Sequence, residues 1–225
     1  MKIRCSALGK ILTEPRSKSE VLSQTAKTYI QELVLEDVYG IKKEFSSRYT
    51  DKGNIQEDES IELAARVLDL PFCTKNDEYF ENEFIKGTPD LVLDDEIIDI
   101  KTSWDGTTFP WFADELPEKN YYWQLIGYMW LTGRKNGRIV YCLVDTPEDI
   151  VLDEIRRTSW KKFELEVSDQ TEKEVRAKHE FGHIPEGLRV KEFKIEYSDA
   201  SVNKIIEKIK DAKEYYNTLV NDLKR

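Results

Sequence analysis

Two patterns of apolar and polar residues run along the chain and together predict an α/β fold. Short, strongly apolar runs, which predict β-strands, cover residues 88–93, 96–102, 138–144 and 189–196. Longer segments with apolar residues at helical spacing, which predict helices, cover residues 19–39, 53–68, 121–131 and 198–223. Strands interleaved with helices in this way favour a central mixed β-sheet flanked by helices.

The first and last predicted helices show the apolar stripe most clearly. In residues 19–39 we expect these side chains to face inward: Val21, Leu22, Ala26, Tyr29, Ile30, Leu33 and Val34. Residues 198–223 form a long amphipathic segment that is either packed on the core or used as a contact between copies of the chain. With 225 residues, we expect a single domain over residues 1–225 that ends in this helix.

A tight turn at Asp94-Asp95 joins the first two predicted strands into a hairpin. A turn of two residues there places Asp90 directly opposite Asp99, and opposed residues point to one face with Cβ atoms roughly 5 Å apart. Lys101 lies two residues beyond Asp99 and therefore shares that face. The hairpin thus brings two carboxylates and an ammonium group together.

Two opposed carboxylates destabilise a hairpin unless a cation offsets their repulsion. Mg²⁺ or Mn²⁺ would do so, because carboxylate oxygens are the ligands these ions prefer. The nearby ammonium can then orient a water molecule or neutralise charge on a phosphate. The alternative is a solvated acidic hairpin. Both strands are strongly apolar, however, which predicts burial, and buried charges need partners.

Upstream, Glu57 lies in phase with the apolar stripe of the helix predicted over residues 53–68. The members of that stripe are Ile61, Ala64, Ala65 and Leu68. Two interpretations are open. Glu57 can belong to a capping box with Asn54 as the N-cap, or it can be a third carboxylate directed at the hairpin.

Downstream, Gln124 and Tyr128 stand four residues apart in an aromatic-rich helix, so their side chains lie one above the other. Most aromatic-rich helices are simply core. The amide of Gln124 is the informative group, because a polar side chain has little reason to lie among such apolar neighbours.

Three motifs occur in a characteristic order. Pro89-Asp90 with Asp99-Ile100-Lys101 resembles the PD-(D/E)xK nuclease superfamily. Gly53-x-x-x-Glu57 is similar to a helix opening of its YqaJ and lambda-exonuclease branch, and Gln124-x-x-x-Tyr128 is similar to a motif of RecB-like and YqaJ-like nucleases. The opening residues 3–10 are similar, less specifically, to the start of phage members. Asp99 departs from the pattern, since that branch usually has Glu there, and its shorter side chain would change the metal spacing.

The resemblance implies a restriction-endonuclease-like core and an exonuclease that degrades linear double-stranded DNA from its ends in phage-type recombination. The implied reaction is a two-metal phosphodiester hydrolysis with Mg²⁺, for which Mn²⁺ can substitute. The same core also supports an end-independent DNA endonuclease, and that alternative stays open.

The resemblance also assigns roles within the site. Asp90 would bridge the metals, Asp99 with the Ile100 carbonyl would complete one metal site, and Glu57 would hold the second metal. Lys101 would position the attacking water. Gln124 and Tyr128 would orient Lys101 or the DNA backbone. The 5′-phosphate contacts of the branch are not placed by any spacing here; the candidates are Arg16, Ser17 and Arg48.

The net charge of the chain bears on how it could contact DNA. A net charge of −10 repels DNA overall, so contact with phosphates needs metal ions or local basic clusters. The candidate clusters are Lys42-Lys43, Arg134-Lys135, Arg138, Arg156-Arg157 and Lys161-Lys162. By resemblance, a toroidal homotrimer would gather basic groups around DNA, and a single-strand annealing protein would be the protein partner.

The three cysteines, Cys5, Cys73 and Cys142, are odd in number and widely spaced. This spacing indicates a reducing compartment and argues against a disulfide framework, a zinc site or a four-cysteine iron–sulfur cluster. No apolar run is long enough to span a membrane, and the N-terminus shows no signal segment. We therefore expect a cytoplasmic protein with no membrane partner, and the resemblance implies that a phage or prophage encodes it.

One rival motif belongs to another class of enzyme. The segment from His179 to His183 satisfies the HExxH pattern of zinc metalloproteases. That chemistry needs both histidines on one face of a continuing helix, and Gly182 with Pro185 works against such a helix. A loop is the favoured interpretation. A catalytically silent DNA-binding module is the third alternative. Separately, the loop over residues 104–120 is rich in aromatic residues, which would either contact a DNA end or plug the core.

Overall fold

The computed structural model describes residues 1–43, 48–71 and 74–224. The helices are η1 (Cys5–Ala7), α1 (Leu8–Ile11), α2 (Gln24–Tyr39), α3 (Arg48–Ile55), α4 (Glu57–Leu68), α5 (Lys119–Thr132), α6 (Glu148–Lys161), α7 (Asp169–His179), η2 (Glu186–Leu188) and α8 (Asp199–Leu223). The strands are β1 (Ile3–Arg4), β2 (Phe80–Glu81), β3 (Ile85–Gly87), β4 (Leu91–Val92), β5 (Glu96–Thr102), β6 (Asn136–Cys142) and β7 (Val190–Glu196). No helix in these ranges is long and apolar enough to cross a bilayer.

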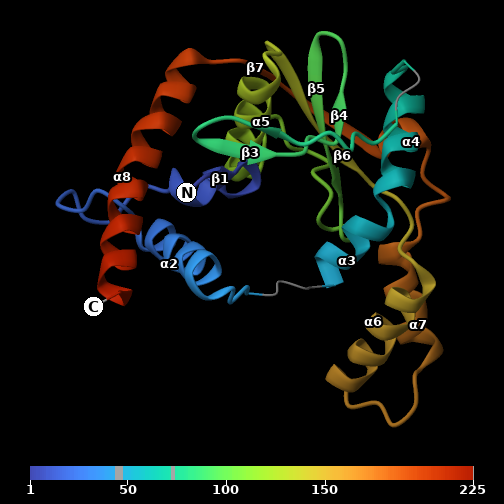
Figure 1. Cartoon of the computed structure of the whole chain (residues 1–225). Coiled ribbons are helices and arrows are strands. Elements are labelled where there is room, and N and C mark those ends of the chain that lie inside the picture. The colour runs from blue at the N-terminus through green and yellow to red at the C-terminus, as the bar shows by residue number, and fades with distance from the viewer. Residues whose placement is uncertain (44–47, 72–73, 225) are drawn as a thin grey trace.

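The main sheet is mixed and has the strand order β4-β5-β6-β7 (Figure 1). Both outer pairs are antiparallel, whereas the central pair β5 and β6 is parallel. Helix α5 makes the crossover between these two parallel strands, as parallel pairing requires. The predicted mixed sheet with flanking helices is confirmed.

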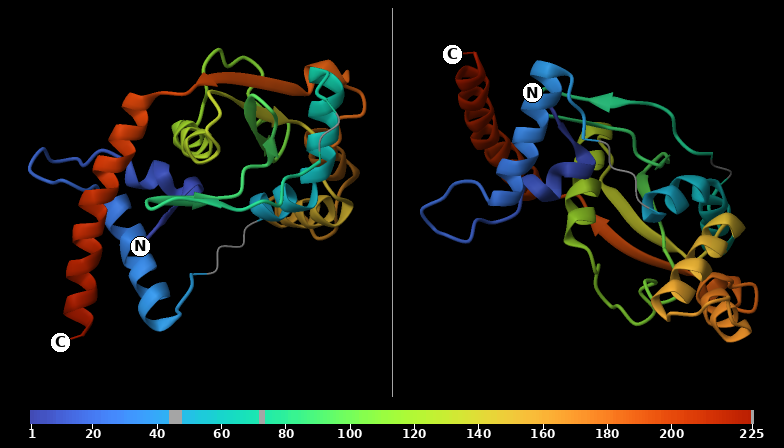
Figure 2. Two further views of the ribbon diagram at one scale, coloured as in Figure 1. Left: turned by 45° about the horizontal axis from the view of Figure 1, so that its top comes forward. Right: turned by 90° about the horizontal axis from the view of Figure 1, so that it is seen from below.

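Each face of this sheet is covered by a helix because residues of both central strands are apolar on both sides. Ile97 and Ile139 belong to the core that includes α5, α1, α2 and α8. Ile98 and Val140 belong to a second core with α4. Figure 2 shows α2 and α8 side by side at one end of the molecule and α6 with α7 at the other. The β5 strand is therefore buried on both faces, and any charge on it lies in a low-dielectric interior.

Helix α2 begins at Gln24, later than the periodicity predicts. The Ser23 hydroxyl accepts a hydrogen bond from the Ala26 amide and caps the helix there. Val21 precedes this cap and is 59% exposed, so its predicted inward position is wrong. The other six side chains predicted to face inward on this helix are buried.

The strand predicted over residues 88–93 is shorter in the structure, where β4 comprises only Leu91 and Val92. Pro89 has no amide hydrogen to donate to a ladder. The carbonyls of Pro89 and Asp90 instead accept hydrogen bonds from the side chain and backbone of Asn76, at 3.0 and 2.8 Å. Gly87 lies in a separate small sheet with the order β1-β3-β2.

Two of the cysteines, Cys5 and Cys142, are buried free thiols. Cys73 lies outside the described residues. The C-terminal helix predicted over residues 198–223 is confirmed as α8, whose Ser198 cap accepts from the Ser201 amide.

Candidate active site

The β4–β5 hairpin has the register that the sequence predicts. Leu91 pairs with Ile98, Val92 pairs with Ile97, and the Leu93 amide donates to the Glu96 carbonyl at 2.9 Å. The same register continued by one residue places Asp90 opposite Asp99.

Asp90 lies just before β4 and is held against β5. Its Oδ2 accepts a hydrogen bond of 2.7 Å from the amide of Ile100, so the carboxylate caps a strand position that the short β4 leaves unpaired. The hydrogen bonds from Asn76 hold the backbone carbonyls of Pro89 and Asp90 itself. The carboxyl group of Asp90 is thereby fixed beside Asp99.

Asp99 is fully buried and is the centre of the site. Its Oδ2 lies 2.6 Å from the Nζ of Lys101, and its Oδ1 accepts from the Nε2 of Gln124 at 3.2 Å. The same Nε2 lies 3.2 Å from the Tyr128 hydroxyl. The Lys101 ammonium also stands 4.5 Å from the centre of the Tyr121 ring. The structure therefore brings together five of the six residues predicted as catalytic, the exception being Glu57.

Burial and like charge shift the acid–base properties of these groups. Burial, with the charge of Asp99 as the second cause, raises the pKa of Asp90 to about 7. Burial also raises the pKa of Asp99, although Lys101 opposes this. Burial lowers the pKa of Lys101, but the two carboxylates outweigh it and the net pKa is raised. The lysine therefore stays protonated, while one proton on the carboxylate pair is held to unusually high pH.

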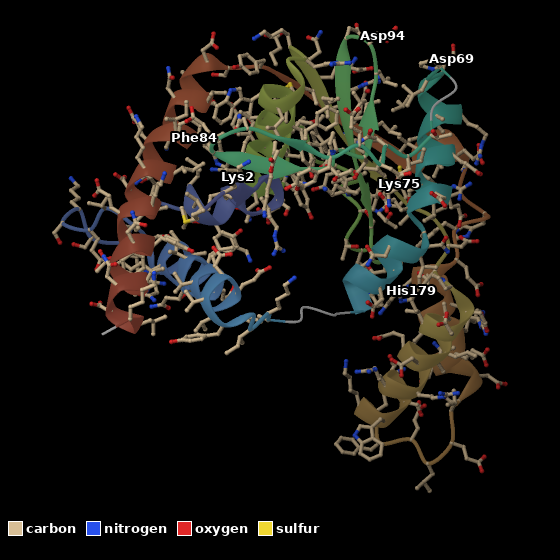
Figure 3. All side chains as sticks on the ribbon, in the orientation of Figure 1. Lys2, Asp69, Lys75, Phe84, Asp94 and His179 are labelled. Carbon is tan, nitrogen blue, oxygen red and sulfur yellow. The ribbon has the colours of Figure 1, made fainter. Side chains whose placement is uncertain are left out.

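Glu57 opens α4, but its side chain is directed to another lysine. Its Oε2 lies 2.6 Å from the Nζ of Lys75, close to the hairpin in Figure 3. Asn54 lies inside α3 and Gln56 is the N-cap of α4, with no side-chain capping bond, so the capping-box interpretation is wrong. The charges of Glu57 and Asp99 both act on Asp90, which places Glu57 near the site.

Three residues that the sequence analysis missed position this assembly. The Nζ of Lys52, which is 1% exposed, donates to the carbonyls of Trp104 and Val144 at 3.0 Å each. These carbonyls follow the carboxyl ends of β5 and β6, so α3 is anchored there and sets the start of α4. The sequence could have identified Tyr121 as a site residue, because it stands three residues before Gln124 on one helix face. Lys75 lies in a loop and left no signal in the pattern.

No protein-family model and no curated protein matches the chain. Among solved structures it is similar to a phage-related exonuclease from Haemophilus somnus 129PT, with 31% identity over 99% of this chain and 96% of that chain and a TM-score of 0.82. The chain belongs to the phage-related exonuclease family.

An alkaline exonuclease from Laribacter hongkongensis, LHK-Exo, shares the fold at 15% identity, with a TM-score of 0.68 over 100% of this chain and 92% of that one. The structure of LHK-Exo in complex with dAMP is similar at 17% identity, with a TM-score of 0.65. These neighbours confirm the nuclease fold predicted from the PD-(D/E)xK motif.

The residues of this exonuclease fit a divalent metal at the two aspartates. Asp90 and Asp99 are oxygen donors of the type that Mg²⁺ prefers, and their mutual repulsion is the cost that a cation offsets. Although it lies 2.6 Å from Lys101, the buried Oδ2 of Asp99 makes no hydrogen bond of normal geometry. In the described part of the chain, no three carboxylate, imidazole or thiol groups are close enough to enclose a metal. Glu57 is held by Lys75 in this structure.

The HExxH segment does not form a zinc site in this exonuclease. Helix α7 ends at His179 and Glu180 is its extended C-cap, so His183 lies beyond the helix. The Nδ1 of His179 lies 2.9 Å from the Thr146 hydroxyl, and its buried ring meets Trp104 edge-on. His183 is exposed. The favoured interpretation of a loop after His179 is confirmed.

The loop over residues 104–120 confirms the plugging interpretation for one of its aromatic residues and leaves another in solvent. Phe109 is 5% exposed and plugs the core, and the Trp111 indole donates to the Gly106 carbonyl at 2.7 Å. Phe112 is 96% exposed.

Proposed function

We propose that this exonuclease hydrolyses double-stranded DNA from its ends with Mg²⁺ as its cofactor. The observation that carries the proposal is the convergence of Asp90, Asp99 and Lys101 on one face of the β4–β5 hairpin. Two buried carboxylates beside a protonated lysine suit phosphodiester hydrolysis, in which negative charge develops on the phosphate.

Asp90, Asp99 and the Ile100 carbonyl would hold one ion, and Glu57 a second. When bound, such ions polarise the phosphate and generate a hydroxide nucleophile at neutral pH. Metal binding requires deprotonated carboxylates, so the proton held by the Asp90–Asp99 pair must leave first. Mn²⁺ has the same preference for oxygen ligands and would substitute.

Lys101 would donate a hydrogen bond to the attacking water or to a phosphate oxygen. Its ammonium is kept charged by Asp99 and is held over the Tyr121 ring, which limits its rotation. Gln124 donates to the opposite oxygen of Asp99 and thereby fixes the carboxylate that holds Lys101. Gln124 and Tyr128 are positioning residues in this scheme.

DNA as the substrate is supported by the family and by the dAMP complex of the structural neighbour LHK-Exo. The proposal extends to assembly: a ring of three copies would surround the duplex, and a single-strand annealing protein would receive the strand that remains. Both extensions rest on the resemblance to the lambda-exonuclease branch.

The test compares equal masses of linear and covalently closed circular duplex DNA, each incubated with Mg²⁺ or with EDTA. We expect loss of the linear DNA only, and only with Mg²⁺. The Asp99→Ala variant, purified in parallel, controls for a contaminating nuclease and should leave both substrates intact. Cutting of the circle would instead establish an endonuclease on the same core. No cutting of either substrate would contradict the proposal.

A further inference from the structure

Helices α6 and α7 form a hairpin that projects from one end of the molecule (Figures 1 and 2). Val151, Ile155 and Val175 give it a small core of its own. The guanidinium of Arg176 on α7 clamps Glu148 on α6 with bonds of 2.7 and 3.0 Å. The hairpin is therefore a defined arm.

The tip of this arm exposes large apolar side chains. Trp160 is 80% exposed, Phe163 is 93% exposed and Leu165 is completely exposed. Phe163 has a φ of 57°, a left-handed conformation that is costly for a bulky residue. Exposed aromatic groups in a cluster mark an interaction site more often than ordinary surface.

A cationic hollow lies at the end of α6, beside this tip. Arg156, Arg157, Trp160 and Lys161 alone line a hollow of about 420 Å³ on α6. Arg157 is paired with Asp153 at 2.6 Å. Within the described ranges, Arg156 and Lys161 form no ion pair and both are exposed. Arg156 lies one helical turn before Trp160 on the same face, and Lys161 follows Trp160 directly and lines the same hollow.

The other basic clusters that the sequence suggested as a DNA track are largely neutralised. Lys42 and Lys43 pair with Glu36 and Glu32. Arg138 is held by Glu96 and Glu192. Lys162 pairs with Glu174, whereas Arg134 donates to backbone carbonyls and Lys135 lies over the Tyr197 ring, so these two are held in place but keep their charge. Arg156 and Lys161 thus differ from the paired clusters, because neither forms an ion pair within the described residues.

We propose that the tip of the α6–α7 arm binds single-stranded DNA, with a base stacked on Trp160 and phosphates contacted by Arg156 and Lys161. Charge complementarity favours this occupant, since the hollow is lined by cations and one indole only. The proposal rests on the proposed function in taking DNA as the substrate. Degradation of one strand of a duplex leaves a single strand, which is the ligand this surface fits.

The arm is joined to the active-site region at its base. The Gly106 amide, in the loop that follows β5, donates to the Lys178 carbonyl at 2.9 Å, and Thr146 contacts His179. Helix α6 has 14 residues, so the tip stands about 20 Å from this base. A strand held at the tip is thus kept away from the Asp90–Lys101 site.

The test is the anisotropy of fluorescently labelled oligothymidine titrated with the full chain in EDTA, where no cleavage occurs. Trp160→Ala should weaken binding by about tenfold, the effect of losing one stacked base. Arg156→Ala with Lys161→Ala should weaken binding and flatten its dependence on salt concentration. In the wild type, DNA should quench tryptophan fluorescence, and Trp160→Phe should remove most of that quenching.

Matched controls separate the tip from general surface effects. Tyr39→Ala removes an exposed aromatic group elsewhere, and Lys210→Ala with Lys213→Ala removes the same charge from α8. Both controls should bind like the wild type. Equal binding by the wild type and the tip variants would overturn the proposal. So would a loss of self-association in Trp160→Ala at unchanged affinity for oligothymidine, because the tip would then be a protein contact. Wild-type cleavage of linear duplex with Mg²⁺ tests the proposed function separately.

Discussion

Two segments of this chain match the pattern of a catalytic site, and their structures differ. The hairpin from Asp90 to Lys101 brings its carboxylates and ammonium together in a buried site. The segment from His179 to His183 separates its two histidines, one buried against Thr146 and the other exposed. A motif therefore predicts chemistry only where the backbone around it has the geometry that the motif assumes.

The physical reason lies in the two backbones. In the β4–β5 hairpin, register and alternation place opposed residues on one face, so two aspartates that are close in sequence converge there. In HExxH the two histidines converge only if the helix continues for one more turn. Here α7 ends at His179 and Pro185 follows within a few residues.

The largest expected effect is on catalysis, when the ammonium group of the hairpin site is removed. Lys101→Met should lower kcat for linear duplex by about 10³-fold, because it removes the ammonium placed to stabilise phosphate charge. DNA affinity measured in EDTA should change by far less. Since the change leaves buried Asp99 without its cation, circular dichroism must show that the variant is folded. Wild-type turnover in a folded variant would contradict the assignment of the site.

The second expected effect is a pH dependence of stability at the hairpin. The pKa of Asp90 is raised from 3.8 to about 7 in the folded state, so its stabilising contribution is full below about pH 4 and is lost as the pH rises through 7. Asp90→Asn cannot ionise and keeps its contribution. In EDTA, Tm of the wild type should therefore fall between pH 5 and pH 8 by roughly 5–10 °C more than Tm of the variant.

Added Mg²⁺ sharpens that measurement. At pH 8 it should restore Tm of the wild type and leave that of Asp90→Asn unchanged, because a bound cation offsets the repulsion between the ionised aspartates. Parallel pH profiles of the two proteins would show that Asp90 is not the group that titrates.

The third effect concerns stability alone. His179→Ala removes a buried ring with its hydrogen bond to Thr146, and should lower the free energy of unfolding by about 2–3 kcal/mol. Thermal unfolding in parallel with Thr146→Val, which removes the same hydrogen bond but keeps the ring, separates the two contributions. Nuclease activity per folded molecule should be retained. Its loss would mean that the base of the arm takes part in catalysis.

The smallest effect is expected at the other histidine. His183→Ala changes an exposed side chain and should shift the free energy of unfolding by less than about 0.5 kcal/mol. DNA cleavage should be unaffected, with or without added zinc. If the wild type showed a zinc-dependent peptidase activity and His183→Ala abolished it, the metalloprotease interpretation would be supported. The HExxH segment would then be a functional site like the hairpin.

The sequence by itself determined the parts of the protein that depend on local order. Strand alternation predicted that Asp90, Asp99 and Lys101 share a face, and helical spacing predicted the pairing of Gln124 with Tyr128. Periodicity predicted α8 and the mixed sheet. In each case the geometry follows from residues close in sequence or from a single turn, so a short window contains the necessary information.

Only the tertiary structure decided which groups from distant segments meet. Asn76 donates hydrogen bonds to the carbonyls of Pro89 and Asp90, where β4 was predicted to continue. Lys75 pairs with Glu57, and Lys52 anchors α3 at the ends of the strands. The spacing of residues along the sequence does not predict such contacts, because each joins two segments that are far apart in the chain. Burial completed the site in the same way: a carboxylate acquires a raised pKa only when distant residues remove water from around it.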